Sequence, residues 1–445
     1  MITKQENIAD FVAIGVGPMN LGLACLTEPI EGLEGIFLDK SDGFDWHPGM
    51  MLQDTTLQIP FMADLVTLAD PTNPFSFLNY IKEQGRIYSF YIRENFLLLR
   101  KEYNQYCQWA IKKLSNIHFQ IEVTEIGYSD VEECYVVFSK CVKTNDRKVY
   151  KAKKLVLGTG TRPYIPRCCK NLKGKSIHSS QYLSHKEELQ SRKSITVLGS
   201  GQSAAEIFYD LLQDIDNKDY QLNWITRSPR FFPLEYAKLT LEMTSPEYID
   251  YFYNLPSHKR EELIKNQKHL YKGINQDLIG DIFDLIYTKQ LTSKVNINLR
   301  TNSELKKAEF DEALDAFYLE IHQHEQDKYY KHQTEGLVLA SGYNYHQPTF
   351  IEGIKDRIQW DEQGRYDVHR NYAIDHRAKD IFVQNAELHT HGFVTPDLGM
   401  ACYRNSYIIK ELTGKDHYPI EKRIAFQQFE VTEEEEITIE NDVLI

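Results

Sequence analysis

The apolar residues near the start of the chain form two short β-prone runs with a glycine turn and a helical segment between them. Residues 10–14 (DFVAI) form the first run, and Gly15 and Gly17 follow it directly. The next apolar segment, LGLACL, suits a helix, and residues 35–40 (GIFLDK) form the second run, which contains Asp39 near its end. This order predicts a strand, a tight turn, a helix and a second strand.

The turn has the composition of a nucleotide-binding turn. Glycine allows it to be tight and allows the backbone to approach a pyrophosphate, whose charge is then held by free N–H groups at the helix N-terminus. Gly15 and Gly17 suit these roles and Pro18 follows them, but Asn20 replaces the third glycine of the GxGxxG pattern, so a plain turn remains open. Asp39 stands where a carboxylate can accept both ribose hydroxyls of an adenosine, unless it is a solvated strand end.

The same order recurs in the middle of the chain. Residues 194–198 (SITVL) run into Gly199 and Gly201, and Gln202 and Ser203 open an apolar segment that suits a helix. Two such units in one chain point to a flavin paired with a nicotinamide, because a hydride must pass from one to the other.

The strand that follows the second turn ends in a cation instead of an acid. Residues 221–227 (QLNWITR) close with Arg227, and Arg230 follows three residues later. An arginine at this place suits a 2′-phosphate, so the sequence favours NADPH over NADH, with FAD as the other cofactor. A surface charge is the alternative interpretation of Arg227.

These patterns predict an α/β fold with two Rossmann-like dinucleotide-binding domains, the second inserted in the first. Residues 155–166 (LVLGTGTRPYIP) and 337–348 (LVLASGYNYHQP) have the pattern of strands where the chain leaves and re-enters the flavin domain. We expect a discontinuous FAD-binding domain over 1–190 and 336–425, an NADPH-binding domain over 191–335 and an acidic tail over 426–445.

Composition and charge narrow the function classes. The 445 residues include 51 Lys and Arg against 64 Asp and Glu, a formal net charge of −13, which disfavours nucleic acid and anionic lipid as partners. The sequence contains no run of about 18 apolar residues, so it predicts no membrane span, and the start of the chain lacks a secretory pattern. The 7 cysteines contain no CxxC pair, so we expect a reducing, cytoplasmic location and neither a disulfide framework nor a zinc site.

Further motifs identify a family. The segment from Trp46 through His47 to Met50 (WHPGM), LQIPF with Gln58, the ASGY strand end and a C-terminal HTHG resemble the flavin-dependent N-hydroxylating monooxygenases of siderophore biosynthesis. The resemblance covers nearly the whole chain, and Ser341, where the family usually has threonine, is a small departure. A flavin disulfide reductase would need a redox-active cysteine pair, and a nucleotide sensor would not need WHPGM and LQIPF.

The resemblance implies a mechanism. NADPH reduces FAD, oxygen adds to form a C4a-hydroperoxyflavin, and a neutral primary amine attacks the distal oxygen to give a hydroxylamine. It places Gln58 beside the flavin C4a as the candidate catalytic residue, and Trp46, His47 and Met50 along the isoalloxazine. It also implies a homo-oligomer. No metal is required, and the pair His389 and His391 is weak evidence for one.

The substrate is where the sequence departs from the amino-acid-using members. In members that use ornithine or lysine, the position of Ala63 typically carries a lysine that binds the substrate's α-carboxylate. In members that use ornithine, the resemblance implies asparagines at the positions of Leu241 and Leu270. Burying a carboxylate without a partner costs several kcal/mol, so the resemblance implies a carboxylate-free amine. Putrescine or cadaverine is favoured, and histamine, L-lysine and L-ornithine remain alternatives.

A diamine has a second ammonium, which needs an acidic partner. The candidate acids near the replaced anchors are Asp64, Glu242 and Glu387, and each can also be interpreted as a structural or surface carboxylate.

Overall fold

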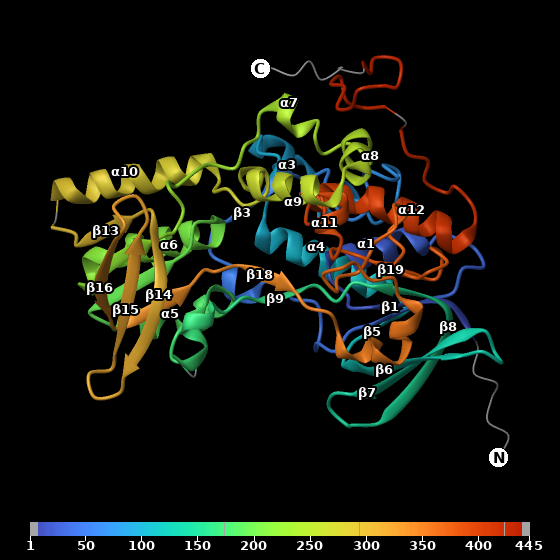
Figure 1. Ribbon diagram of the computed structural model, residues 1–445, viewed down its shortest axis with the longest axis horizontal. Coiled ribbons are helices and arrows are strands. Elements are labelled where there is room, and N and C mark those ends of the chain that lie inside the picture. Colours follow the sequence, from blue (N-terminus) through green and yellow to red (C-terminus); the bar gives the residue numbers. More distant parts are fainter. Residues whose placement is uncertain (1–7, 173, 293, 422, 438–445) are drawn as a thin grey trace, which may run out of the picture.

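The computed structural model describes residues 8–172, 174–292, 294–421 and 423–437. Residues 1–7, at the start examined for a secretory pattern, and residues 438–445 of the expected acidic tail lie outside the described residues. Two sheets organise the molecule, one on each side of Figure 1, and the segments joining them meet in its centre.

The first sheet contains the N-terminal turn. Its strands lie in the order β5-β2-β1-β8-β7-β6, and β19 also pairs with β8. Strands β5, β2, β1, β8 and β19 are parallel, whereas β7 and β6 continue the sheet as an antiparallel hairpin. The bounds are β1 (Ala9–Ile14), β2 (Gly35–Leu38), β5 (Ile117–His118), β6 (Ile121–Ser129), β7 (Cys134–Cys141), β8 (Arg147–Leu157) and β19 (Ile381–Val383).

The second sheet contains the second turn and is parallel throughout, in the order β10-β17-β11-β12-β13. A three-stranded antiparallel sheet covers one of its faces, because the two share one apolar core. The bounds are β10 (Ile177–His178), β11 (Ser194–Leu198), β12 (Gln221–Ile225), β13 (Ile297–Arg300), β14 (Ser303–Asp311), β15 (Ala316–Gln323), β16 (Lys328–Thr334) and β17 (Gly336–Leu339).

Two small antiparallel pairs lie between the sheets. They are β3 (Thr56–Pro60) with β4 (Leu97–Leu99), and β9 (Thr161–Pro163) with β18 (Tyr343–Tyr345). The second pair brings together the chain leaving the first sheet and the chain returning from the second.

Helices cover the sheets with their apolar faces. Helices α1, α4 and α12 pack on one face of the first sheet, and α5, α6 and α10 pack on the second sheet. The remaining α-helices lie above and between them. The bounds are α1 (Pro18–Thr27), α2 (Phe77–Glu83), α3 (Ile87–Arg93), α4 (Arg100–Lys113), α5 (Tyr182–Gln190), α6 (Gln202–Lys218), α7 (Lys238–Leu241), α8 (Pro246–Asn254), α9 (Ser257–Asn266), α10 (Gln276–Thr292), α11 (Leu388–His391) and α12 (Ala401–Thr413).

The second sheet extends beyond the range expected for the nicotinamide domain, 191–335. It includes β10 and also β17, which is the LVLASGY strand that we expected at the re-entry into the flavin domain. The LVL runs at 155–157 and 337–339 are both buried and pair in parallel with a neighbouring strand. Because their composition is the same, the sequence does not predict which sheet each run joins.

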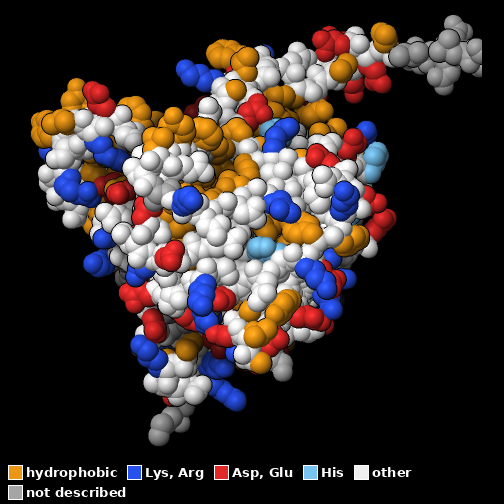
Figure 2. Space-filling view, turned by 90° about the vertical axis from the view of Figure 1, so that its left-hand side faces the viewer, with side chains coloured by type: hydrophobic (Ala, Val, Ile, Leu, Met, Phe, Trp, Pro, Cys, Tyr) orange, Lys and Arg blue, Asp and Glu red, His pale blue; other side chains and the backbone are white. Residues whose placement is uncertain are grey.

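The surface is mixed in charge. Figure 2 shows Lys and Arg interspersed with Asp and Glu over one face, and apolar side chains gathered along its upper edge. Helix α10 exposes Phe283, Tyr287 and Leu291, which follow one another at intervals of four residues. None of the described helices is long and apolar enough to cross a membrane.

Substitution by alanine is expected to have opposite effects on stability at two helical glycines. A Cβ on Gly22 of α1 would lie 2.8 Å from the Leu65 carbonyl oxygen, whereas a Cβ on Gly280 of α10 meets no atom within 4 Å. Alanine gains about 1 kcal/mol over glycine in a helix, but overpacking costs about 1–3 kcal/mol. We expect Gly22→Ala to lower the denaturant midpoint and Gly280→Ala to raise it. A rise for both variants would show that the α1 contact is not tight.

Candidate functional site

The first glycine turn is closed on one side and open on the other. Gly15 has a φ of +90°, and a Cβ there would lie 2.3 Å from the Gly158 carbonyl oxygen, so the position requires glycine. Gly17 caps α1, with Pro18 at the first helical position, and a Cβ on Gly17 would meet no atom within 4 Å. The open side therefore leaves room for a ligand at the helix N-terminus.

Two polar residues hold this turn in place. Asn20 is buried; its Nδ2 donates to the Gly15 carbonyl at 2.7 Å, and its Oδ1 accepts from Gln384 Nε2 at 2.6 Å. Asp39 accepts from the backbone N–H of Val16 at 2.7 Å. Asn20 thus links the turn to the end of β19, and the Asp39 carboxylate lies beside the turn as a ribose-binding role requires.

The second turn repeats the arrangement. A Cβ on Gly199 would lie 2.4 Å from the Ala340 carbonyl oxygen, and the Trp224 indole N–H donates to the Gly199 carbonyl at 2.8 Å. Gly201 caps α6, which begins with Gln202 and Ser203. The side at the helix start is narrower here, because a Cβ on Gly201 would lie 3.5 Å from the Lys272 carbonyl oxygen. A close strand on one side and a helix N-terminus on the other are again the features of a pyrophosphate site.

Cations gather beside the second turn. Arg227 follows β12 and Arg230 lies three residues on, both exposed, and none of the carboxylates in the described ranges forms an ion pair with either. Partial burial lowers the pKa of Lys272, and the charges of Lys268 and Arg227 lower it further. A hydrogen bond from a neighbouring lysine and also the charge of Arg227 lower the pKa of the Glu304 carboxyl, so an acid lies near this cation. A cluster of cations beside a glycine turn favours an anionic ligand.

The WHPGM segment lies between the two turns. The Trp46 ring is 4.9 Å from His47 and 5.3 Å from Tyr103, and His47 has a left-handed backbone with φ of +53°. The Met50 side chain is buried in the core of the second sheet, and a Cβ on Gly49 would lie 1.9 Å from the Ser180 carbonyl oxygen. This segment therefore joins the two units by close packing.

A chain of polar contacts also joins them. Arg100, the first residue of α4, lies with Nη2 2.5 Å and Nη1 2.8 Å from the two carboxylate oxygens of Glu206 in α6. Gln202 Nε2 donates to Glu206 at 2.8 Å, and Gln58 Nε2 donates to Gln202 Oε1 at 3.2 Å. The Gln58 amide in β3 is therefore held at the start of the helix that follows the second turn.

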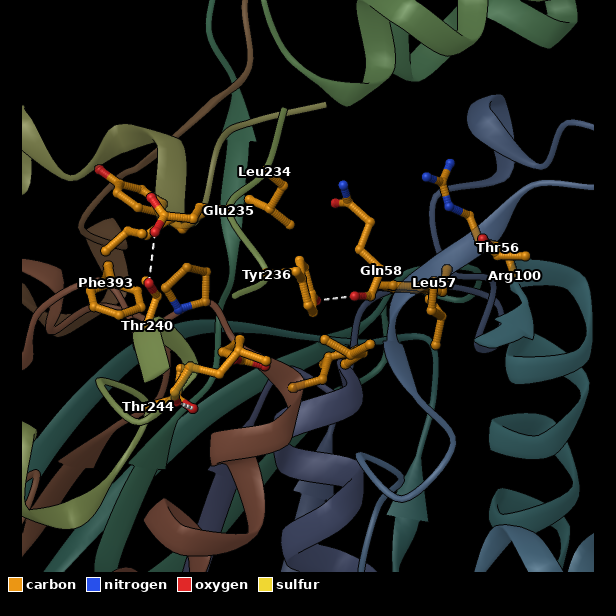
Figure 3. A pocket seen from close by; sticks show the side chains of 18 residues that line it. Thr56, Leu57, Gln58, Arg100, Leu234, Glu235, Tyr236, Thr240, Thr244 and Phe393 are labelled. Carbon is orange, nitrogen blue, oxygen red and sulfur yellow. Dashed lines mark hydrogen bonds between the residues drawn. The ribbon is translucent and has the colours of Figure 1, made fainter. Parts of the chain in front are cut away.

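A cavity of about 240 Å³ opens next to Gln58. Figure 3 shows Tyr236 reaching across to the backbone of Gln58, to whose carbonyl its hydroxyl donates, and Glu235 lying beside Thr240. The wall is largely apolar, and its residues are Trp46, Thr56, Leu57, Gln58, Ile59, Arg100, Leu234, Glu235, Tyr236, Thr240, Leu241, Thr244, Leu270, Tyr271, Phe393, Pro396, Asp397 and Leu398.

Comparison with known proteins identifies the family. Residues 7–345 match the family model described as L-lysine 6-monooxygenase/L-ornithine 5-monooxygenase. The chain belongs to this family. It is 55% identical over 425 residues to a protein named putrescine N-hydroxylase of Shewanella oneidensis, covering 96% of this chain and 85% of that one. It is 50% identical to an alcaligin biosynthesis enzyme of Bordetella pertussis, covering 96% and 92%.

A solved family structure confirms the predicted fold. The structure described as the FAD-bound cadaverine monooxygenase of desferrioxamine biosynthesis from Erwinia amylovora has a TM-score of 0.94 and 60% identity, covering 96% of this chain and 99% of that one. The expected resemblance and the expected fold class of two Rossmann-like units are thus both confirmed.

Of the three positions expected to distinguish this chain from amino-acid-using members of the family, two line the cavity. Leu241 and Leu270 both contribute to its wall. Ala63 is not in the wall but is buried behind it, beside Gly399, since a Cβ on that glycine would lie 3.7 Å from the Ala63 methyl. Leu241 and Leu270 therefore contribute apolar atoms to the cavity wall.

None of the three acids expected to serve a second ammonium lines the cavity. Asp64 is buried and accepts from the backbone N–H groups of Val66, Thr67 and Phe77, so it organises a loop. Glu242 accepts from the N–H groups of residues 426 and 427. Glu387 is fully buried, and its Oε1 lies 2.9 Å from the Arg404 guanidinium.

The two carboxylates in the cavity wall are Glu235 and Asp397, which sequence reasoning missed. Glu235 lies six residues before Leu241 and Asp397 lies five residues after HTHG, so a search a few residues wider around these positions would have included both.

The histidines of HTHG hold the backbone. His389 Nε2 is 2.8 Å from the Tyr366 carbonyl oxygen, and His391 Nε2 is 3.2 Å from that of Arg370. Burial lowers the pKa of His391 well below its usual value, so the ring is neutral near pH 7. Within the described residues, no group of three or more His, Cys, Asp or Glu side chains could hold a metal ion.

Proposed function

We propose that this chain is an FAD- and NADPH-dependent enzyme that N-hydroxylates one amine of a small diamine, putrescine or cadaverine, and so supplies a hydroxylamine for a hydroxamate siderophore. The observation that carries the proposal is the cavity beside Gln58, whose wall includes Leu241 and Leu270, in a chain 60% identical to a cadaverine monooxygenase and 55% identical to a putrescine N-hydroxylase. A substrate carboxylate would find no polar anchor at either leucine.

The residues present fit the two cofactors. The open side of Gly17 and the Asp39 carboxylate suit FAD, whose ring would extend past Trp46 and His47 toward Gln58. The start of α6, with Gly201, Gln202 and Ser203, suits the NADPH pyrophosphate. Arg227 and Arg230, which pair with no acid in the described part of the chain, suit its 2′-phosphate.

When bound, the flavin supplies the activation of dioxygen, and the chain itself prepares the amine. An alkyl ammonium has a pKa near 10.4 and no lone pair, so the reacting end must lose its proton. Apolar surroundings such as Leu241 and Leu270 disfavour the charged form and lower that pKa. The Gln58 side-chain amide donates to Gln202 and its backbone carbonyl accepts from Tyr236, so this residue is held at both its side chain and its backbone.

Three further expectations from the sequence, on domain division, oligomeric state and location, belong to the same proposal. We propose the domain division expected from the sequence, with the edges of the inserted unit moved outward to include β10 and β17. A homo-oligomer is supported by the apolar stripe on α10. A cytoplasmic location is supported by the 7 cysteines, none of which forms a disulfide.

Gly17→Val tests the FAD site without straining the fold. The backbone at Gly17 is extended, with φ of −84° and ψ of 179°, and the new side chain would point into open space. We expect a folded protein that has lost most of its flavin absorbance, because the valine occupies the place of the pyrophosphate. Gly280→Ala is the control and should retain the flavin; a fully yellow Gly17→Val protein would refute this site.

Replacing Arg227 and Arg230 by glutamine tests the choice of nicotinamide. A charge-assisted contact is worth about 1.5–3 kcal/mol, so the KM for NADPH should rise about tenfold to a hundredfold while that for NADH hardly changes. The matched control is Lys259→Gln, which removes an exposed cation from α9. Equal use of NADPH and NADH by the unaltered enzyme would contradict the assignment.

The substrate class is tested by hydroxylamine formation with putrescine, cadaverine, histamine, L-ornithine and L-lysine. A diamine should have the highest kcat/KM, and each amino acid should be poorer than its decarboxylated form by about a hundredfold or more, because its carboxylate finds no polar anchor at Leu241 or Leu270. Ala63→Lys should weaken diamine turnover by bringing a cation toward the pocket. The proposal fails if an amino acid has the highest kcat/KM. If histamine has the highest kcat/KM, the substrate is not a diamine, but the explanation from the missing carboxylate anchors still holds.

A further inference from the structure

The cavity wall poses a problem for a diamine substrate. Leu241 and Leu270 suit the methylene chain and the reacting amine, but the second amine remains an ammonium. A buried ammonium without a partner costs several kcal/mol, so a substrate of this kind needs an acidic group in the same cavity. This step rests on the proposed function. The candidates are the two carboxylates of the wall, Glu235 and Asp397.

Glu235 already has partners for both carboxylate oxygens. Its Oε1 accepts from the Thr240 hydroxyl at 2.6 Å, and its Oε2 lies 3.2 Å from His269 Nε2. The side chain is 43% exposed, so water also solvates it. An ammonium would gain little at this carboxylate, because it would compete with contacts that are already made.

Asp397 has an acceptor to spare. Its Oδ1 accepts from the Gly399 N–H at 2.8 Å, and no donor among the described residues hydrogen-bonds its Oδ2. Burial raises the pKa of Asp397, although the Gly399 N–H and the Arg404 charge act in the opposite direction. Arg404 itself lies against the buried Glu387 at 2.9 Å. Asp397 is only partly exposed, and its Oδ2 is available to an ammonium that enters the cavity.

The surroundings of Asp397 connect it to the substrate positions expected from the sequence. A Cβ on Gly399 would lie 3.2 Å from Asp397 Oδ1 and 3.7 Å from the Ala63 methyl, so Asp397 and Ala63 flank the same glycine. In amino-acid-using relatives the resemblance implies a lysine at position 63. This chain therefore has an acid in the region where those relatives bring a cation.

We propose that the Asp397 carboxylate binds the distal ammonium of the diamine while Leu241 and Leu270 pack along its methylenes. Asp397 is then a residue that selects for the second amine and takes no part in oxygen chemistry. The reacting amine and the distal ammonium then each have a contact in the cavity, and a monoamine of equal length loses the contact with Asp397.

The test compares cadaverine with pentylamine and putrescine with butylamine, using the flavin-loaded enzyme. In the unaltered enzyme the diamine should exceed the matched monoamine in kcat/KM by about tenfold to a hundredfold, mainly through KM. Asp397→Asn keeps an oxygen for the Gly399 N–H and removes the charge, so it should bring that ratio close to one, with the larger loss falling on the diamine. Calorimetry should show the same loss in the Kd of cadaverine.

Two further variants separate selection from a structural role. Asp397→Glu keeps the charge and should restore most of the preference, while Glu235→Gln should keep the ratio of the unaltered enzyme. Flavin content should be the same in all three variants. An Asp397→Asn enzyme that retains the diamine preference, or a Glu235→Gln enzyme that loses it, overturns the assignment.

The outcome also distinguishes this inference from the proposed function. An unaltered enzyme that hydroxylates pentylamine as well as cadaverine refutes the role of Asp397 and keeps the amine N-hydroxylase. An enzyme that hydroxylates none of these amines refutes the proposed function, and the selection by Asp397 fails with it.

Discussion

The contact between Arg100 and Glu206 fixes the relation of the two nucleotide-binding units. Arg100 begins α4 directly after β4, and Glu206 lies in the first turns of α6, so the pair ties the small β3–β4 sheet to the start of the second unit's helix. Both carboxylate oxygens of Glu206 are within 2.8 Å of the guanidinium, and the Glu206 side chain is only 3% exposed. A carboxylate buried to this degree needs its partner, so the two units cannot separate here without exposing an unpaired charge.

The position of Gln58 depends on this contact. Gln202 donates to Glu206 and accepts from Gln58, so the ion pair on α4 and α6 sets where the Gln58 amide lies in β3. The cavity opens between β3 on one side and the Leu234–Tyr236 segment on the other, and Tyr236 closes the gap by donating to the Gln58 carbonyl. A flavin on the first turn and a nicotinamide on the second would therefore meet at a preset place.

Sequence alone could predict the units because each rests on local chemistry. Gly15 has a left-handed backbone, and Gly199 lies too close to a neighbouring strand to carry a side chain. Only glycine satisfies both conditions, so the two turns can be predicted from the sequence. The role of Asn20 was not visible, because its partner Gln384 lies 364 residues away. The sequence also could not predict which sheet β17 joins. A buried apolar run is required both for pairing with β11 and for pairing with a strand of the first sheet.

The acids could not be assigned for a related reason. Asp64 is next to Ala63 in sequence, but its side chain turns back to cap the N–H groups of its own loop, including Thr67 at 2.6 Å. Asp397 is far from Ala63 along the chain, yet both lie against Gly399 in space. Two residues that are close in sequence have neighbouring backbones. Which of them binds a charged substrate group depends instead on whose side chain points into the cavity.

The charge at Asp397 also bears on what the cavity rejects. An apolar wall makes a carboxylate-bearing substrate costly, but a bound water could relieve part of that cost. A fixed carboxylate adds a repulsion that strengthens as water is excluded, because the effective dielectric falls. One acid beside Ala63 would then attract the second ammonium of a diamine and repel the α-carboxylate of an amino acid. Without a lysine at position 63 the cavity would not require a carboxylate, and the proposed contact with Asp397 would favour amines that carry a second ammonium.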